Sequence, residues 1–102
     1  MPSPARLIWL PEAIADLKRH REFIRPHNPA AARRAAQTIK QAAERLRNRP
    51  KLGKPVEDLP EFYELTAPFG RGSYILRYRS VGPMVVIVAI WHSSEDRNSL
   101  DD

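Results

Sequence analysis

The sequence predicts an α+β domain in which an N-terminal helical hairpin packs on an antiparallel sheet, with the element order β-α-α-β-β-β. Two observations support this fold class. Two helical stretches flank a short Pro/Asn junction, and three strand-like runs follow one another in the C-terminal half. A chain of 102 residues without cysteine forms one domain, residues 1–102, and no disulfide.

The N-terminal half contains a short strand and two helices. Residues 6–10 predict the strand, and Pro11 suits the first position of a helix that ends near residue 25. Asn28 and Pro29 predict the cap and first turn of a second helix, which Pro50 stops. The junction is so short that the helices must be antiparallel. The apolar stripe of the first helix comprises Ala13, Ile14, Leu17, Phe23 and Ile24.

The C-terminal half reads as a meander of three strands. Residues 51–55 form a turn-rich connector, and residues 62–67 form the first strand. Residues 73–79 alternate, with Tyr74, Leu76 and Tyr78 on one face, whereas residues 84–92 are a near-continuous apolar run typical of a strand buried on both faces. The N-terminal strand is expected to pair at one side of the meander. The helices then cover one sheet face, and the other face is open or is covered by something from outside the chain. Residues 93–102 form a frayed tail.

Charge is distributed unevenly along the chain. Residues 1–54 carry 13 Lys/Arg and 4 Asp/Glu, whereas residues 55–102 carry 4 and 8. A basic helical half indicates an acidic partner, either nucleic acid or an acidic protein segment. The alternative is a solvated helix surface without a partner. The candidate binding residues are Arg33, Arg34, Lys40, Arg45, Arg71, Arg77, Arg79 and His92.

Several classes of function lack their motifs. The three histidines are not at metal-ligand spacing, and the glycines form no dinucleotide or phosphate-binding fingerprint. We therefore expect no metal and no cofactor. The N-terminus does not resemble a signal peptide, and the longest apolar run is too short to span a bilayer. A cytoplasmic protein without a membrane partner is the expectation.

Basic side chains beside the sheet are the remaining candidates for chemistry. Arg77 and Arg79 project from a strand, where guanidinium groups suit phosphate or carboxylate recognition, and His92 could transfer protons near neutral pH. Each has a structural alternative. Arg77 can pair with Glu64 on the neighbouring strand, and His92 can cap the sheet edge.

The ordered set of elements resembles the RelE/ParE superfamily of toxins from type II toxin–antitoxin modules, which include plasmid stabilisation proteins. The resemblance rests on the basic hairpin, the connector Lys51-Leu-Gly-Lys-Pro55, the run Tyr74-Ile-Leu-Arg-Tyr-Arg79 and the apolar strand that ends in His92. It covers residues 5 to 97. RelE-like members cleave mRNA on the ribosome without a metal, whereas ParE-like members lack that site and are known for poisoning DNA gyrase.

The positions of the RelE-like basic residues carry other residues in this chain. The resemblance places two lysines of that site at Glu64 and Thr66, one arginine at Ile75 and a second arginine near Ser93. A phosphoryl transition state needs preorganised positive charge, which these residues do not supply. The pattern Tyr-Ile-x-x-Tyr-Arg at residues 74–79 instead matches ParE-like sequences. The resemblance therefore implies the ParE-like branch.

Three hypotheses follow. In the first, a ParE-like toxin binds DNA gyrase without catalytic residues and is neutralised in a hetero-oligomer by a cognate antitoxin with an acidic, partly disordered segment. In the second, the chain is a metal-independent endoribonuclease that cuts mRNA on the ribosome with Arg77, Arg79 and His92. In the third, it is a degenerate relative without toxicity.

Overall fold

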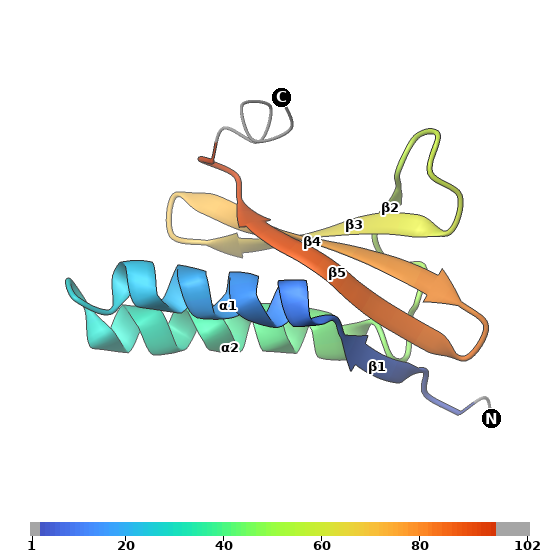
Figure 1. Ribbon diagram of the computed structural model, residues 1–102, viewed down its shortest axis with the longest axis horizontal. Coiled ribbons are helices and arrows are strands. Elements are labelled where there is room, and N and C mark those ends of the chain that lie inside the picture. The colour runs from blue at the N-terminus through green and yellow to red at the C-terminus, as the bar shows by residue number, and fades with distance from the viewer. Residues whose placement is uncertain (1–2, 96–102) are drawn as a thin grey trace.

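The computed structural model describes residues 3–95, which form two helices and one five-stranded sheet (Figure 1). The elements, in chain order, are β1 Arg6–Trp9, α1 Pro11–Ile24, α2 Pro29–Arg45, β2 Lys54–Pro55, β3 Phe62–Phe69, β4 Gly72–Val81 and β5 Met84–His92. The predicted α+β class and the order of the main elements are confirmed. The prediction missed β2, which lies inside the expected connector.

The sheet has the strand order β1-β5-β4-β3-β2. The strands from β2 to β5 pair antiparallel, whereas β1 runs parallel to β5, so the N-terminal strand pairs at one side of the meander as predicted. The helical hairpin covers one face of the sheet, and no described element covers the other (Figure 1).

The helix boundaries follow their local signals. Pro11 and Pro29 begin the two helices, and the Asn28 side chain accepts a hydrogen bond of 3.0 Å from the backbone N–H of Ala31. The second helix ends at Arg45 and not at Pro50, because Leu46 and Arg47 already donate their N–H groups three residues back in a tighter turn.

The core lies between the hairpin and one face of the sheet. Small residues on α2 let it approach the sheet closely, and Ile39 is fully buried among them. Tyr74, Leu76 and Tyr78 face this core, as the alternation of β4 predicts. The predicted stripe of α1 is wrong at two positions, because Ile14 is 53% exposed and Phe23 is 79% exposed.

A β-bulge shapes β5. The register shifts opposite Arg77 and Tyr78, so that Ile87 and Ile90 both face the helices although they are three residues apart. The prediction that β5 is buried on both faces holds for the helix side, where Val85, Ile87 and Ile90 are 0% exposed. On the other face Trp91 is also buried, whereas Val86 and Ala89 are half-buried.

The chain end lies partly outside the described residues. Residues 93–95 form a turn in which Glu95 donates its backbone N–H to the His92 carbonyl. The rest of the predicted frayed tail, residues 96–102, lies outside the described residues. Within residues 3–95 no helix is long and apolar enough to cross a membrane.

Candidate functional site

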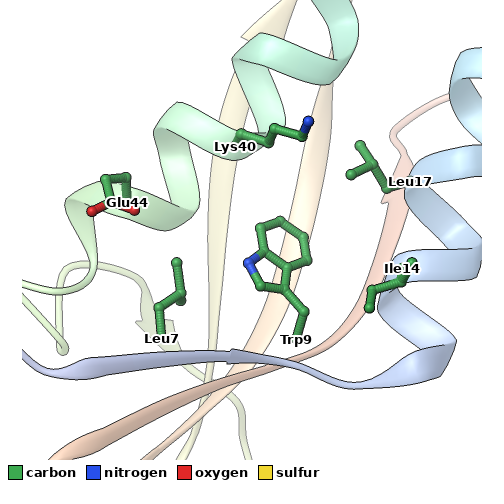
Figure 2. A pocket seen from close by; sticks show the side chains of 6 residues that line it. All are labelled: Leu7, Trp9, Ile14, Leu17, Lys40 and Glu44. Atoms are coloured by element: carbon green, nitrogen blue, oxygen red, sulfur yellow. The ribbon is translucent and has the colours of Figure 1, made fainter.

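An apolar groove of about 380 Å³ opens between β1 and the two helices. Its lining residues are Leu7 and Trp9 from β1, Ile14 and Leu17 from α1, and Lys40 and Glu44 from α2. Figure 2 shows the Trp9 indole standing between the helices, with Leu7 beside it. Each pair comes from one local periodicity: alternate residues share a strand face, and residues three or four apart share a helix face. The groove therefore exposes large apolar side chains that could anchor a partner.

The α2 side of the groove is positively charged. Glu44 is engaged by Arg47, whose Nη1 lies 2.8 Å from its Oε1. Lys40 is exposed and has no ion pair within residues 3–95. Arg33 lies two turns before Lys40 on the same side of the helix and is also exposed. An amphipathic segment with an acidic side would complement this groove.

The backbone of β1 adds an open strand edge to the groove. Arg6 donates its N–H to the Pro83 carbonyl, and Leu10 donates its N–H to the Ile87 carbonyl. The backbone N–H and C=O groups of every second residue of β1 therefore point toward β5. Leu7 and Trp9 therefore direct their N–H and C=O groups outward, toward the side opposite β5. Ala5 also points outward, but its N–H and C=O already bond to the backbone oxygen and the Nε of Arg47. Two residues of β1 thus remain available for strand addition.

The far edge of the sheet is less suited to strand addition. Lys54 pairs with Glu64, and the Phe62 carbonyl accepts a hydrogen bond from the Val56 N–H. The backbone N–H and C=O groups of the even-numbered residues of β3 therefore point away from β4. The next outward residues are Thr66 and Pro68. Proline has no N–H, and it is typical of edge strands that avoid pairing.

Side chains close the part of the β5 edge that β1 does not cover. The Ile90 N–H donates to Asp16 Oδ2 at 2.9 Å, and the Ile90 carbonyl lies 3.1 Å from His20 Nε2. Further along, the His92 N–H donates to Glu95 Oε1 at 3.3 Å. Asp16 and His20 come from α1, so the helix satisfies the backbone groups that a neighbouring strand would otherwise bind.

Burial favours the neutral form of His20, although its Nδ1 lies 3.5 Å from Glu95 Oε1. Burial lowers its pKa below the usual 6.5, and the nearby Arg19 guanidinium adds to this effect, against opposing contributions from the Ile90 carbonyl and two carboxylates. Because its partner is a carbonyl, Nε2 must carry the proton and donate it. Its ring also packs edge-on against Tyr74, with centroids 5.1 Å apart.

The open sheet face carries two arginines that acidic residues engage. Arg77 donates to Glu64 Oε2 from Nε at 2.9 Å and from Nη2 at 2.7 Å, which confirms the structural alternative for this residue. Its guanidinium also lies 5.3 Å from the Trp91 ring centroid. Arg79 lies over Phe62 and within 3.6 Å of Glu61.

Three of the four positions at which the resemblance places RelE-like basic residues meet on this same face. Thr66 pairs directly with Ile75. Two residues along the same strands, Glu64 pairs with Arg77, and both pairs lie on the same face. The patch formed by Glu64, Thr66 and Ile75 therefore contains one carboxylate, one hydroxyl and one aliphatic side chain. Its neighbouring cation, Arg77, is already bound to the carboxylate.

The structure places His92 away from the two arginines. His92 pairs with Tyr74, whose ring faces the helices, and the two ring centroids lie 5.1 Å apart. Its Nδ1 accepts a hydrogen bond of 3.1 Å from the Ser94 N–H, and its ring packs against Gly72, where an added Cβ would lie 2.7 Å from Cε1. The sheet thus separates His92 from Arg77 and Arg79.

The other predicted binding residues are spread over the surface. Arg34 and Arg45 lie on the side of α2 away from the groove, where Arg45 lines a second hollow of about 250 Å³ beside Pro68. Arg71 is exposed in the turn between β3 and β4. No three His, Asp or Glu side chains among residues 3–95 converge as metal ligands would. Sequence reasoning missed the groove residues Leu7 and Trp9, although a tryptophan on a four-residue edge strand was a usable signal.

Two helices on one face of a small, mainly antiparallel sheet are the fold that this chain shares with proteins of type II toxin–antitoxin systems. Residues 7–97 match the family described as the ParE toxin of type II toxin–antitoxin system, parDE. The chain therefore belongs to the RelE/ParE toxins, within the family of the ParE toxin.

Two toxins named RelE are similar to this chain. Toxin RelE1 of Caulobacter vibrioides is 33% identical over 85 residues, which cover 83% of this chain and 89% of the relative. Toxin RelE3 of the same organism is 37% identical over 87 residues, which cover 85% and 92% of the two chains. Because the family is described by ParE and these relatives are named RelE, their names do not identify the target of this chain.

Two solved structures share the fold. A chain from the chromosomal ParDE toxin–antitoxin system of P. aeruginosa matches with a TM-score of 0.72 and 26% identity, over 84% of this chain and 92% of that one. A chain from the RelBE2 toxin–antitoxin complex of Mycobacterium tuberculosis matches with a TM-score of 0.62 and 25% identity, over 93% and 98%.

Proposed function

We propose that this toxin inhibits growth by binding DNA gyrase in the cytoplasm, without cutting RNA, and that a cognate antitoxin neutralises it. The observation that carries the choice of target is the open sheet face. Where the resemblance places the basic residues of a RelE-like nuclease, this chain has Glu64, Thr66 and Ile75, and Arg77 is bound to Glu64.

The chemistry of RNA cleavage argues against catalysis at this face. Negative charge develops on the phosphoryl group in the transition state, and catalysis requires donors and cations aimed at it beforehand. The Glu64 carboxylate would repel that charge. Releasing Arg77 would break two hydrogen bonds of 2.9 and 2.7 Å to Glu64 and leave this carboxylate uncompensated. A toxin that acts by binding needs none of these groups.

The antitoxin proposal rests on the groove and the β1 edge together. An amphipathic helix can place apolar residues against Trp9 and Ile14 while acidic residues meet Lys40 and Arg33. An adjoining extended stretch can pair with the outward groups of Leu7 and Trp9. Such a segment would fold as it binds. The two solved structures described above come from toxin–antitoxin assemblies, which supports a hetero-oligomer here.

The gyrase proposal has a direct test. Purified toxin is added to gyrase-catalysed supercoiling of relaxed plasmid and to an assay for covalent cleavage complexes. Loss of supercoiling, or accumulation of cleaved plasmid, is expected in proportion to toxin. Toxin that has been mixed beforehand with its antitoxin is the control and should have no effect. Unchanged supercoiling and cleavage at a large excess of toxin would reject gyrase as the target.

The second candidate function is the ribosome-dependent endoribonuclease. The observation that favours it is the orientation of His92, whose Nδ1 is fixed by Ser94 while Nε2 has no hydrogen-bond partner within residues 3–95. Here a translating extract is treated with toxin and the transcript is mapped by primer extension. Cleavage that is lost in His92→Ala and Arg77→Ala would establish this function, and an intact transcript would reject it.

A degenerate relative without toxicity remains the third candidate. It predicts that inducible expression of the chain without any antitoxin leaves growth unchanged. Growth arrest that co-expression of the antitoxin reverses would reject it.

A further inference from the structure

The segment from Arg45 to Lys54, which joins α2 to β2, is unusually basic. It carries five cations and no acidic residue in ten positions, and we call it the basic connector: Arg45, Arg47, Arg49, Lys51 and Lys54. It includes most of the motif Lys51-Leu-Gly-Lys-Pro55, to which the groove and the open sheet face assign no role. It leaves the end of α2 and leads into the short β2 strand (Figure 1).

Most of these cations are available to a partner. Arg47 is occupied, because its Nη1 bonds to Glu44 at 2.8 Å and its Nε bonds to the Ala5 carbonyl at 3.1 Å. The other four are exposed and form no ion pair among residues 3–95. Four uncompensated positive charges on one short segment repel one another, and a polyanion would relieve that repulsion.

The basic connector is fixed to the core and is not a flexible linker. Leu52 donates its N–H to the Arg49 carbonyl at 3.0 Å, which closes a turn. Gly53 donates its N–H to the Tyr78 hydroxyl at 3.0 Å, and Tyr78 is 0% exposed. An added Cβ on Gly53 would lie 2.6 Å from the Glu64 carbonyl oxygen, so only glycine permits this close approach. The charges are therefore presented from a preorganised backbone.

We propose that the basic connector binds the phosphate backbone of duplex DNA. Arginine and lysine side chains neutralise phosphates and release counterions, and such contacts are independent of sequence. The choice of DNA rests on the proposed function, because gyrase acts on duplex DNA and a toxin bound to it lies beside that duplex. The exposed acidic residues Glu57 and Asp58 follow β2 and bound the DNA-binding surface on that side.

The contact has a quantitative signature in its salt dependence. Each neutralised phosphate contributes about −0.9 to the slope of log K against log salt concentration, so four cations predict a slope of about −3.6. Affinity then falls about a hundredfold between about 50 and about 200 mM salt. Fluorescence anisotropy of purified toxin with a labelled short duplex of arbitrary sequence measures this slope without gyrase.

Two double variants locate the contact. In the first, Arg49→Ala is combined with Lys51→Ala, and the slope should become about 1.8 units less negative. The matched control combines Arg33→Ala with Arg34→Ala at the other end of α2, which removes the same charge and should leave the slope unchanged. All four side chains are exposed, so both variants should keep the circular dichroism spectrum of the parent toxin.

Three results would overturn the proposal. These are equal weakening by both double variants, no binding of the parent toxin at low salt, and tighter binding of an RNA duplex of the same length than of the DNA. The proposed function is judged separately in the supercoiling assay. A toxin that inhibits gyrase but fails to bind DNA would reject the DNA contact alone.

Discussion

The two halves of the β5 edge have different neighbours. Along its first half, β1 pairs from Met84 to Ile87 and leaves its own outer edge open at Leu7 and Trp9. Along its second half, side chains of Asp16, His20 and Glu95 bond to the backbone, and no strand from residues 3–95 is added. The contrast shows how a small sheet restricts where a further strand can attach. One edge remains open beside an apolar groove, and the adjacent edge is closed by α1.

The α1 helix lines the groove beside β1 and also closes the second half of the β5 edge. Ile14 and Leu17 face the groove, whereas Asp16 and His20 face the β5 edge. Helical spacing separates these pairs by about a third of a turn, so one amphipathic helix carries an apolar side for a partner and a polar side for the sheet. Four substitutions, ordered from the largest expected effect to the smallest, test this division.

Trp9→Ala should have the largest effect, on antitoxin affinity. Removing an aromatic anchor from the centre of a groove typically costs about 2 kcal/mol or more, so affinity should fall at least about thirtyfold. Isothermal titration calorimetry with the antitoxin measures it. Phe23→Ala is the control, because Phe23 is an exposed apolar residue of α1 outside the groove and should leave affinity unchanged. Equal losses in both variants would mean that the groove is not the antitoxin site.

Asp16→Ala should destabilise the fold by about 1–3 kcal/mol, because the Ile90 N–H loses its acceptor in a part-buried position. Urea denaturation gives the free energy of unfolding, and hydrogen exchange should show faster exchange of the Ile90 amide. Asp16→Asn retains an acceptor oxygen and should recover most of the loss. If the amide exchanges at the parent rate in Asp16→Ala, the side chain does not close this edge.

Leu7→Pro should weaken antitoxin binding by about 0.5–1.5 kcal/mol while leaving most of the stability intact. It removes an outward N–H that no described residue uses, and proline is tolerated on such an edge. Ile8→Pro is the matched control, because the Ile8 N–H faces β5 and its loss should lower the melting temperature clearly. Leu7 also lines the groove, so Leu7→Ala is measured beside it, and only the further loss of affinity in Leu7→Pro tests strand addition. Unchanged affinity in Leu7→Pro would mean that no strand pairs there.

The pH dependence of stability should show the smallest effect. His20 has a pKa lowered by burial, so below about pH 6.5 the unfolded chain binds a proton that the folded chain does not. Stability should therefore fall as the pH drops below this value and be unaffected by His20 above it. Asp16, Arg19 and Glu95 are the charged groups around it. Thermal melts from pH 5 to 8 should differ between the parent and His20→Gln, which keeps a donor but does not titrate.

Local signals in the sequence were sufficient for most of the fold. The Asn28 cap and the alternation of β4 were predicted correctly because each depends on neighbours within one element. The α+β class follows from the order of these elements along the chain. The pairing of Arg77 with Glu64 was also foreseen, as one of two alternatives. The two-residue strand β2 was missed because it depends on Gly53 approaching the Glu64 carbonyl, a contact between distant parts of the chain.

The site was harder to predict than the fold. Ile14 was predicted to be a core residue but lines the groove, since an apolar stripe looks the same whether it faces a core or a partner. The sequence also did not show that His92 lies on the opposite sheet face from Arg77 and Arg79. Which residues of two strands share a face depends on the pairing register, and that register includes a bulge here. The side chains that close the β5 edge lie on a helix about 70 residues earlier, a distance that no local pattern spans.

The sequence by itself determined the two helices, four of the five strands, their order and the basic helical half, and the family resemblance placed Glu64, Thr66 and Ile75 where RelE-like toxins carry cations. These depend on residue type and short-range periodicity. The tertiary structure alone decided which edge stays open, which arginines are already paired and where the groove lies. Those features arise from contacts between elements, and side chains that share no local pattern become neighbours only when the helices pack on the sheet.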